Sequence, residues 1–418
     1  MRQSGWMSGG IESRHAWVRL AASLALSTIG SVGMWSVVVV LPAVQAEFGT
    51  DRATASLPYT SIMLGFVAGG VLMGRLADRR GVVLPVLVGT ASLGLGYAVT
   101  AASPSMLVFA LASGAFIGLA GASAVFSPLV ADISRWFDRN RGIAVALVAS
   151  GNYLAGAIWP PLLEALVSAR GWRTTQLIAG AACVVLMLPL ALLLRRPVPA
   201  ESPAAAAAAA QIAPRPLGLA PNTLQGLLAI AALGCCVAMS MPQVHIVAYC
   251  VDLGYGPARG AEMLALMLAF GIVSRLASGV IMDRIGGLAT LLLGALLQAV
   301  ALALYLPFDG LAALYVVSAV FGLFQGGIVP AYAFIVREYF PPSEAGTRVG
   351  IAISATLAGM ALGGWLSGVM FDLAGSYRAA VLNGLAWNVL CVAIVAWLLR
   401  RALAQDSVAD AAGLATRG

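Results

Sequence analysis

The sequence contains no lysine, only two histidines and few charged residues of either sign. Charged residues make up 10% of the 418 residues, whereas an average soluble domain contains about 25%. Hydrophobic residues make up 61%, so too little polar surface remains to cover a globule of this size in water. A water-soluble fold is therefore excluded, and we expect lipid to contact most of the exterior of the chain.

Residues suited to catalysis or metal binding are also scarce. The histidines are His15 and His245, and the sequence has no Ser/His/Asp arrangement, phosphate-binding loop or metal-ligand spacing. The five cysteines include the adjacent pair Cys235 and Cys236, which does not suit a disulfide framework. We therefore expect a protein that is not an enzyme and that uses no cofactor and no metal.

Long apolar runs take up most of the chain. Each is long enough to cross a bilayer core of about 30 Å as a helix, which pairs its backbone groups internally. A transmembrane β-barrel would instead show short segments of alternating polarity. The twelve runs are residues 18–44, 55–74, 82–101, 106–133, 142–167, 175–194, 224–250, 259–282, 288–306, 311–336, 349–371 and 379–399.

The distribution of arginine predicts the orientation. If both termini are cytoplasmic, the cytoplasmic segments carry most of the arginines, and the opposite side carries only Arg52, Arg170, Arg173, Arg259 and Arg378. This asymmetry follows the positive-inside rule. We therefore expect a multi-pass protein of the inner (plasma) membrane with both termini in the cytoplasm and the first run retained as a helix. The same asymmetry accounts for the net charge of +7, so no nucleic-acid partner is expected.

The second half of the chain repeats motifs of the first. The pattern G-x-x-x-D-R-x-G occurs at residues 74–81 and again at 279–286. Further matches at a similar offset indicate an internal duplication, and a proline- and alanine-rich segment separates the copies. The expected organisation is a tail 1–17, a six-helix bundle 18–194, a cytoplasmic linker 195–223, a second six-helix bundle 224–401 and a tail 402–418.

The repeated loops are candidate gating elements. Their glycines allow helices to approach closely, and Asp78 is able to accept hydrogen bonds from the N-terminus of a neighbouring helix in one conformation. A plain solvated turn is the alternative, which the recurrence in the second half disfavours. The candidate gating residues are Gly74, Asp78, Arg79, Gly81, Arg141, Gly279, Asp283 and Arg284.

These motifs resemble the major facilitator superfamily, in which the loop after helix 2 usually reads G-x-L-A-D-R-x-G. The resemblance implies an all-α membrane protein with twelve transmembrane helices in two pseudo-symmetric six-helix bundles. Two stretches, residues 35–52 and 136–144, are similar to the monocarboxylate porter family within it. The second stretch includes Arg141 in the aromatic and basic residues that begin helix 5 of that family.

Arg275 is the charged residue that lies deepest in an apolar run. An arginine at such depth costs about 2.5–3.5 kcal/mol on insertion scales, so it should face a cavity or a partner. Monocarboxylate porters carry an arginine at this place and often an aspartate four residues earlier, where this chain has Gly271. Because a guanidinium matches a carboxylate, we interpret Arg275 as binding a substrate anion. A structural arginine bonded to helix carbonyls is the alternative.

Other polar residues of the runs are candidate substrate contacts. His245 is a candidate for proton coupling, with a packing histidine as the alternative, and Tyr249 lies one turn further on the same face. The remaining candidates are Asn152, Tyr153, Gln325, Tyr332 and Tyr59, although such residues are individually more typical of hydrogen bonding between helices. The acidic residues lie near the ends of the runs, so no deep carboxylate is expected.

These features favour a secondary carrier for a small monocarboxylate anion that works by alternating access, with proton symport as an option. One alternative is a carboxylate exchanger of the oxalate–formate type, which usually needs a second cation. Another is an exporter of lipophilic compounds, and a non-transporting membrane sensor is least favoured. The expected partners are a small organic acid anion, protons and the lipid bilayer, and we expect a monomer.

Overall fold

The computed structural model describes residues 12–137, 139–196 and 217–415, with the side chains of 342, 343 and 406–415 left aside. Most of the predicted linker 195–223 and parts of both predicted tails lie outside the described residues. Within the described part, every regular element is a helix. The prediction of an all-α protein is therefore confirmed.

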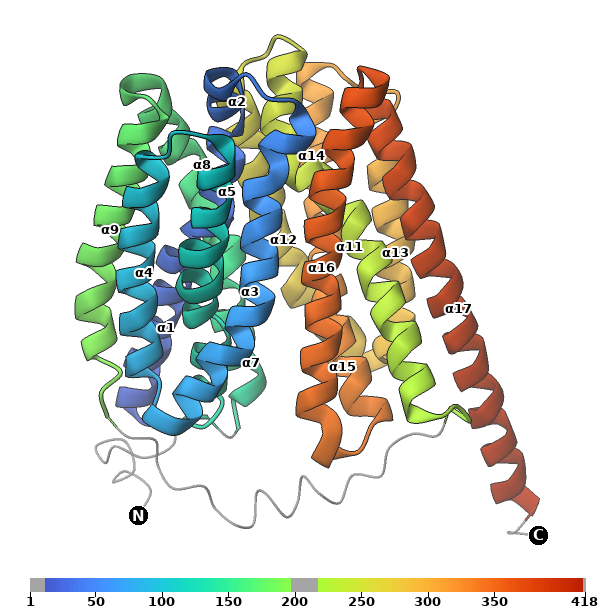
Figure 1. Ribbon diagram of the computed structural model, residues 1–418. Helices are drawn as coiled ribbons and strands as arrows, with labels where there is room; N and C mark the ends of the chain where they lie inside the picture. Colours follow the sequence, from blue (N-terminus) through green and yellow to red (C-terminus); the bar gives the residue numbers. More distant parts are fainter. Residues whose placement is uncertain (1–11, 138, 197–216, 416–418) are drawn as a thin grey trace.

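The first half of the chain forms helices that run back and forth along one axis (Figure 1). Several of the predicted runs are divided into two or more helices, because the backbone changes direction or helix type inside them. The elements are α1 (Arg14–Gly30), α2 (Val32–Phe48), α3 (Arg52–Arg80), α4 (Val83–Ala101), α5 (Met106–Ala112), η1 (Ser113–Gly121), η2 (Ala122–Val125), α6 (Ser127–Ile133), α7 (Arg141–Ala149), α8 (Gly151–Arg170) and α9 (Trp172–Leu192).

The second half repeats this arrangement. Its elements are α11 (Pro221–Asp252), α12 (Pro257–Ile285), α13 (Gly287–Ala303), α14 (Leu311–Gln325), α15 (Ile328–Tyr339), α16 (Pro342–Ala374) and α17 (Tyr377–Ala415). In the described chain, eleven segments are long and apolar enough to cross a membrane, and the apolar helix Gly287–Ala303 is slightly shorter. Together they match the twelve predicted runs. Helix α17 continues past residue 401, so much of the predicted C-terminal tail is helical.

The fourth run of each half is interrupted near its middle. In the first half it passes from α5 through the π-helical η1 and the 3-10 helix η2 into α6, and in the second half α14 and α15 meet at Gly326 and Gly327. Glycines on both sides of these interruptions allow backbones to touch. A methyl group built on Gly69 of α3 would overlap the carbonyl oxygen of Leu119, and one built on Gly322 would overlap that of Met267.

The repeated G-x-x-x-D-R-x-G motifs end equivalent helices. Gly81 follows α3 with φ +77°, and Gly286 follows α12 with φ +81°. These backbone conformations disfavour a side chain. Each glycine N–H donates to a carbonyl of the last turn, that of Ala77 or Met282. The duplication seen in the sequence therefore corresponds to two copies of the same helix ending.

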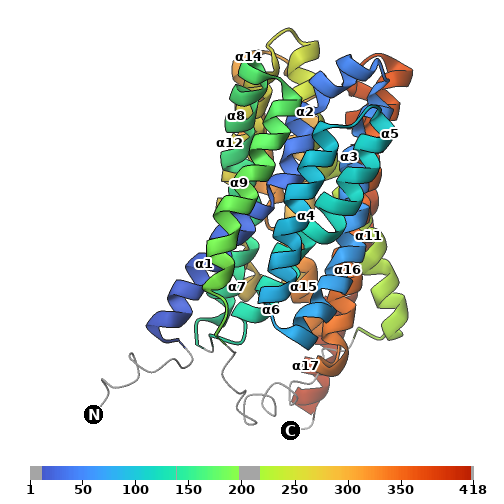
Figure 2. The same ribbon diagram turned by 60° about the vertical axis from the view of Figure 1, so that its left-hand side comes forward.

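The two halves lie side by side and are not equally close along their length. We call the end where α1 begins and α17 ends the terminal end, and the opposite end the distal end. In Figure 1 the ribbons of α3 and α16 lie together toward the distal end, at the top, and diverge toward the terminal end. Figure 2 shows from a second direction that α1 and α17 reach the same terminal end.

Substituting Gly322 by alanine should destabilise the protein, because the added methyl group would overlap the Met267 carbonyl of α12. Overpacking of this kind typically costs about 1–3 kcal/mol, which should lower the thermal unfolding midpoint in detergent. The matched control is Gly279→Ala on α12, where an added methyl group meets nothing within 4 Å. Equal unfolding midpoints for the two variants would contradict the close approach of α12 and α14.

Candidate substrate site

Arg275 lies on α12 at the boundary between the two halves, about 15 Å along the helix from its terminal end at 1.5 Å per residue. Its side chain is half-buried. Nη1 donates to the carbonyl of Ala149 in the first half at 2.9 Å, and Nε donates to that of Gly326 at 3.3 Å. No carboxylate of the described residues pairs with the guanidinium, and no described group bonds to Nη2. One face of this cation is therefore held while one nitrogen stays available.

Tyr153 of α8 provides a surface for this cation. The guanidinium carbon of Arg275 lies 4.0 Å from the centre of the Tyr153 ring, a distance at which the ring attracts a positive charge. The Tyr153 hydroxyl contacts Oε1 of Gln325 at 3.1 Å, and Nε2 of Gln325 is buried with no hydrogen-bond partner in the described chain. Three of the predicted contacts, Arg275, Tyr153 and Gln325, are thus brought together by α12, α8 and α14.

The absence of a side chain at Gly271 makes this arrangement possible. A Cβ atom built there would lie 2.5 Å from Cδ1 of Tyr153, which is closer than atoms pack. An aspartate at this position, one helical turn before Arg275, would displace the tyrosine ring as well as neutralise the arginine. The structure therefore gives Gly271 a steric role in addition to the missing counter-ion noted in the sequence.

Two other predicted contacts are engaged within the protein. The indole N–H of the buried Trp35 donates to the backbone carbonyl of Asn152 at 3.0 Å and to its Oδ1 at 3.2 Å, which fixes α8 against α2. Tyr332 is fully buried in the second half, with its hydroxyl 3.4 Å from Sγ of Cys235 and 3.6 Å from Sγ of Cys391. Tyr332 is thus placed among helices of one half and apart from Arg275.

The distal end is closed by a carboxylate that caps a helix of the opposite half. Asp372, near the end of α16, accepts hydrogen bonds from the backbone N–H of Arg52 at 2.9 Å and of Ala53 at 2.7 Å. These are free donors of the first turn of α3, which a negative charge satisfies well. The first turn of α3 and the last turns of α16 are therefore joined across the two halves.

The side chain of Arg52 reinforces this contact. Nη2 pairs with Oδ1 of Asp252 at 2.9 Å and Nη1 donates to the hydroxyl of Tyr377 at 2.8 Å, while the guanidinium carbon lies 4.7 Å from the Phe371 ring centre. Arg52 is only 7% exposed. We call Arg52, Asp252, Asp372 and Tyr377 the distal gate.

His245 adjoins the distal gate. Its Nδ1 lies 3.1 Å from the Tyr377 hydroxyl, and its Nε2 lies 2.8 Å from the carbonyl oxygen of Gly364 on α16. Tyr59 of α3 packs beside the same glycine, and its buried hydroxyl has no hydrogen-bond partner among the described residues. His245 and Tyr59 therefore lie with the distal gate, and neither contacts Arg275.

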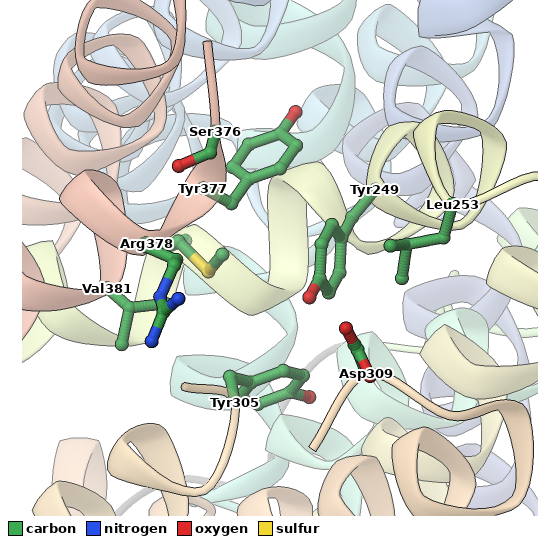
Figure 3. Close-up of a pocket in the computed structure, with 9 residues that line it drawn as sticks. Tyr249, Leu253, Tyr305, Asp309, Ser376, Tyr377, Arg378 and Val381 are labelled. Carbon is green, nitrogen blue, oxygen red and sulfur yellow. The ribbon is translucent and has the colours of Figure 1, made fainter. Parts of the chain in front are cut away.

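Tyr249 lines a separate cavity of about 180 Å³ at the distal end of the second half. Figure 3 shows Tyr249 and Asp309 facing Arg378 across this space, while the hydroxyl of Tyr377 points away from Asp309. The rings of Tyr249 and Tyr377 lie 5.3 Å apart between centres. One wall of the cavity is thus a residue of the distal gate.

The predicted gating residues of the repeated loops lie at the terminal end. Gly74 and Gly279 have room for a methyl group, and Asp78, Arg79, Arg141, Asp283 and Arg284 are exposed. Asp78 makes a loose ion pair with Arg135 at 3.7 Å, within its own half, and caps no described helix of the other half. This position leaves Asp78 free of the cross-half contact that Asp372 makes at the distal end.

Sequence reasoning missed the partners of several acidic residues. It noted Arg52 without its partner Asp372, and it gave no partner for Asp132, which forms a buried ion pair of 2.7 Å with Arg19. Glu164 of α8 is also buried, and its Oε2 has no described partner. One spacing in the sequence does indicate that Asp372 is equivalent to Asp78. Each aspartate precedes, by three residues, the glycine that ends its helix.

Comparisons with known sequences agree with this architecture. The family model of the Major Facilitator Superfamily matches residues 24–311 and 263–416. The chain is 28% identical to Monocarboxylate transporter 13 of Bos taurus over 334 residues, which are 78% of this chain and 75% of that one. It is 29% identical over 280 residues to Monocarboxylate transporter 11 of Homo sapiens, covering 64% of this chain and 56% of the relative. The MFS-type transporter pynF of Aspergillus niger is 25% identical over 314 residues, 74% of this chain and 70% of the relative.

Solved structures share the fold at low sequence identity. A nucleoside transporter NupG variant superposes with a TM-score of 0.69 at 13% identity, covering 91% of this chain and 99% of that one. A bacterial homolog of the human lysosomal transporter Spinster gives 0.65 at 16% identity, covering 93% and 96%. The arrangement of helices in two repeated halves, the family match and the transporter relatives agree with one another. The chain therefore belongs to the Major Facilitator Superfamily, resembles its monocarboxylate porters, and is a multi-pass membrane transporter rather than an enzyme.

Proposed function

We propose that this protein is a secondary carrier of a small monocarboxylate anion, with Arg275 binding the carboxylate. The observation that carries the proposal is a half-buried guanidinium at the boundary of the halves with no carboxylate partner in the described chain and with Nη2 free of bonds. A substrate carboxylate would supply the missing negative charge and accept from Nη2. The names of the relatives Monocarboxylate transporter 13 and 11 support the same class of substrate.

The shape of the molecule supports transport by alternating access. The distal gate joins the halves on one side of Arg275, and the halves diverge on the other side (Figure 1). Arg275 would then be reached from the terminal end in this conformation. With both termini in the cytoplasm of the inner (plasma) membrane, as the arginine asymmetry predicts, this is the inward-facing state. Opening of the distal gate and closure around Asp78 and the other gating residues would expose the site to the opposite side.

The alternatives fit less well. An exchanger of the oxalate type carries a dianion and usually needs two cations, whereas the described contacts of Tyr153 and Gln325 include one cation, Arg275. An exporter of lipophilic compounds is compatible with fungal MFS-type relatives such as pynF, but it gives no role to an unpaired arginine in this site. A monocarboxylate uses both the charge and the apolar surroundings.

Substituting Arg275 by alanine should abolish counterflow of labelled lactate or pyruvate in proteoliposomes. Removing the charged partner of a bound carboxylate typically costs about 2–5 kcal/mol, which corresponds to a loss of affinity of roughly 30-fold or more. Arg259→Ala on the same helix is the matched control, because Arg259 is exposed and pairs with Glu262. Undiminished counterflow by the Arg275 variant would exclude this arginine from substrate binding, and no counterflow by the wild type would exclude these substrates.

Substituting Asp372 by alanine should weaken closure of the distal end, because α3 loses the cap on its first turn. Loss of a helix cap costs about 1 kcal/mol, so the ratio of closed to open molecules should fall roughly five-fold. The measurement is the rate at which a membrane-impermeant thiol reagent modifies Thr60→Cys, below the gate. Asp309→Ala, at the same end but outside the gate, serves as the control, and equal rates in both backgrounds would argue against the gate.

A further inference from the structure

The hydrogen bonds between Arg52, Tyr377, His245 and Gly364 form one directed chain across the two halves. An arginine nitrogen only donates, so the hydroxyl oxygen of Tyr377 accepts from Arg52 Nη1 at 2.8 Å. A carbonyl oxygen only accepts, so Nε2 of His245 carries a hydrogen and donates to Gly364 at 2.8 Å. The Tyr377 hydroxyl hydrogen then has one acceptor on this path, Nδ1 of His245 at 3.1 Å. This chain is complete with a neutral imidazole that carries its hydrogen on Nε2.

A proton on Nδ1 is incompatible with this chain. His245 is 0% exposed, so no water could rearrange to accommodate the additional N–H. Nδ1–H would point at a hydroxyl whose own hydrogen also points at Nδ1, and that hydroxyl would have to turn its hydrogen elsewhere in a buried space. The imidazolium would also place a second positive charge next to Arg52, without a carboxylate of its own.

The charges around His245 do not offset this conflict. Tyr377 from α17 contacts Nδ1, and Arg52 from α3 donates to the same hydroxyl. Tyr59 from α3 packs beside Gly364 of α16, and Tyr249 from the same helix as His245 packs on the Tyr377 ring. The two carboxylates of the distal gate bond to other groups, Asp252 to the Arg52 side chain and Asp372 to the first turn of α3. Arg52 therefore acts against a charged imidazole, and among the described hydrogen bonds and ion pairs no carboxylate bonds to the ring.

We propose that His245 is a proton-binding site that is coupled to the distal gate: the gate closes on the neutral imidazole, and protonation of Nδ1 opens it. The proton comes from solvent that reaches the site when the distal end opens, and it forms the Nδ1–H bond without further chemistry. Because coupling is reciprocal, closing the gate must also return the proton to the solvent on the distal side. This inference rests on the proposed function and adds a proton-dependent control of the distal gate.

The first test uses the small number of histidines. Protein labelled with ¹⁵N-histidine gives signals from His15 and His245 alone, and His245→Asn assigns them. The gate is held shut by a short bifunctional maleimide between Ala53→Cys and Leu373→Cys, which flank the contact of Asp372 with α3. The reagent should react mainly at these two positions, because the native cysteines of the described chain are all buried. The same double variant without the reagent is the control.

We expect the unlinked protein to protonate His245 as the pH falls, and the cross-linked protein to keep the neutral Nε2–H tautomer to a pH lower by at least about one unit, a tenfold difference in proton affinity. Equal protonation of His245 in the two samples would overturn the proposal. This measurement needs no substrate, so it stands apart from the counterflow test of Arg275.

The second test measures the gate itself. Spin labels at Pro104→Cys and Gly310→Cys, on the distal connections of the two halves, should move apart on acidification in the wild-type background, and this response should be absent in His245→Asn. Tyr377→Phe keeps the ring but removes the hydroxyl, and should give a shallower response than its control Tyr305→Phe. A full response in His245→Asn would overturn the proposal, and its loss in Glu164→Gln instead would assign the proton to that buried carboxyl.

Discussion

Arg52 determines much of what this structure can do, because its backbone and side chain both join the first half of the molecule to the second. Its N–H is capped by Asp372, and its guanidinium is shared by Asp252, Tyr377 and the Phe371 ring. In a membrane, an arginine without such partners is expensive. The distal end is therefore closed by a cation that is stable only while the second half supplies its partners. When the halves separate, water must replace those partners.

Arg275 meets the same requirement in a different way. Backbone carbonyls and the face of Tyr153 hold its guanidinium, so the charge is tolerated without being neutralised. One arginine thus closes the molecule, whereas the other leaves a positive site that an anion can complete. The contrast between a satisfied and an unsatisfied cation is the physical basis for proposing a gate at Arg52 and an anion site at Arg275.

The two aspartates at the ends of α3 and α16 suggest how the halves exchange contacts. Asp372 caps the start of α3 at the distal end, whereas Asp78, three residues before the glycine that ends α3, makes only a loose pair within its own half. Because the two helices run in opposite directions, each ends near the start of the other. A rocking motion of the halves would release one cap as the other forms.

The sequence by itself determined that lipid surrounds most of the chain, which class of fold it adopts, and that its two halves are duplicated. Low charge, twelve apolar runs and two copies of one motif leave few alternatives, since helices must pair their backbones internally in lipid. It also identified Arg275, because a charge in an apolar run is conspicuous without any structure. Long-range partners were not predictable in this way. Three features depend on how the helices rotate and cross. They are the carboxylate that pairs with Arg52, the need for Gly271 to lack a side chain, and the positions of Tyr332 and His245 away from Arg275. Those angles are decided by side-chain packing between segments up to hundreds of residues apart, so only the tertiary structure could supply them.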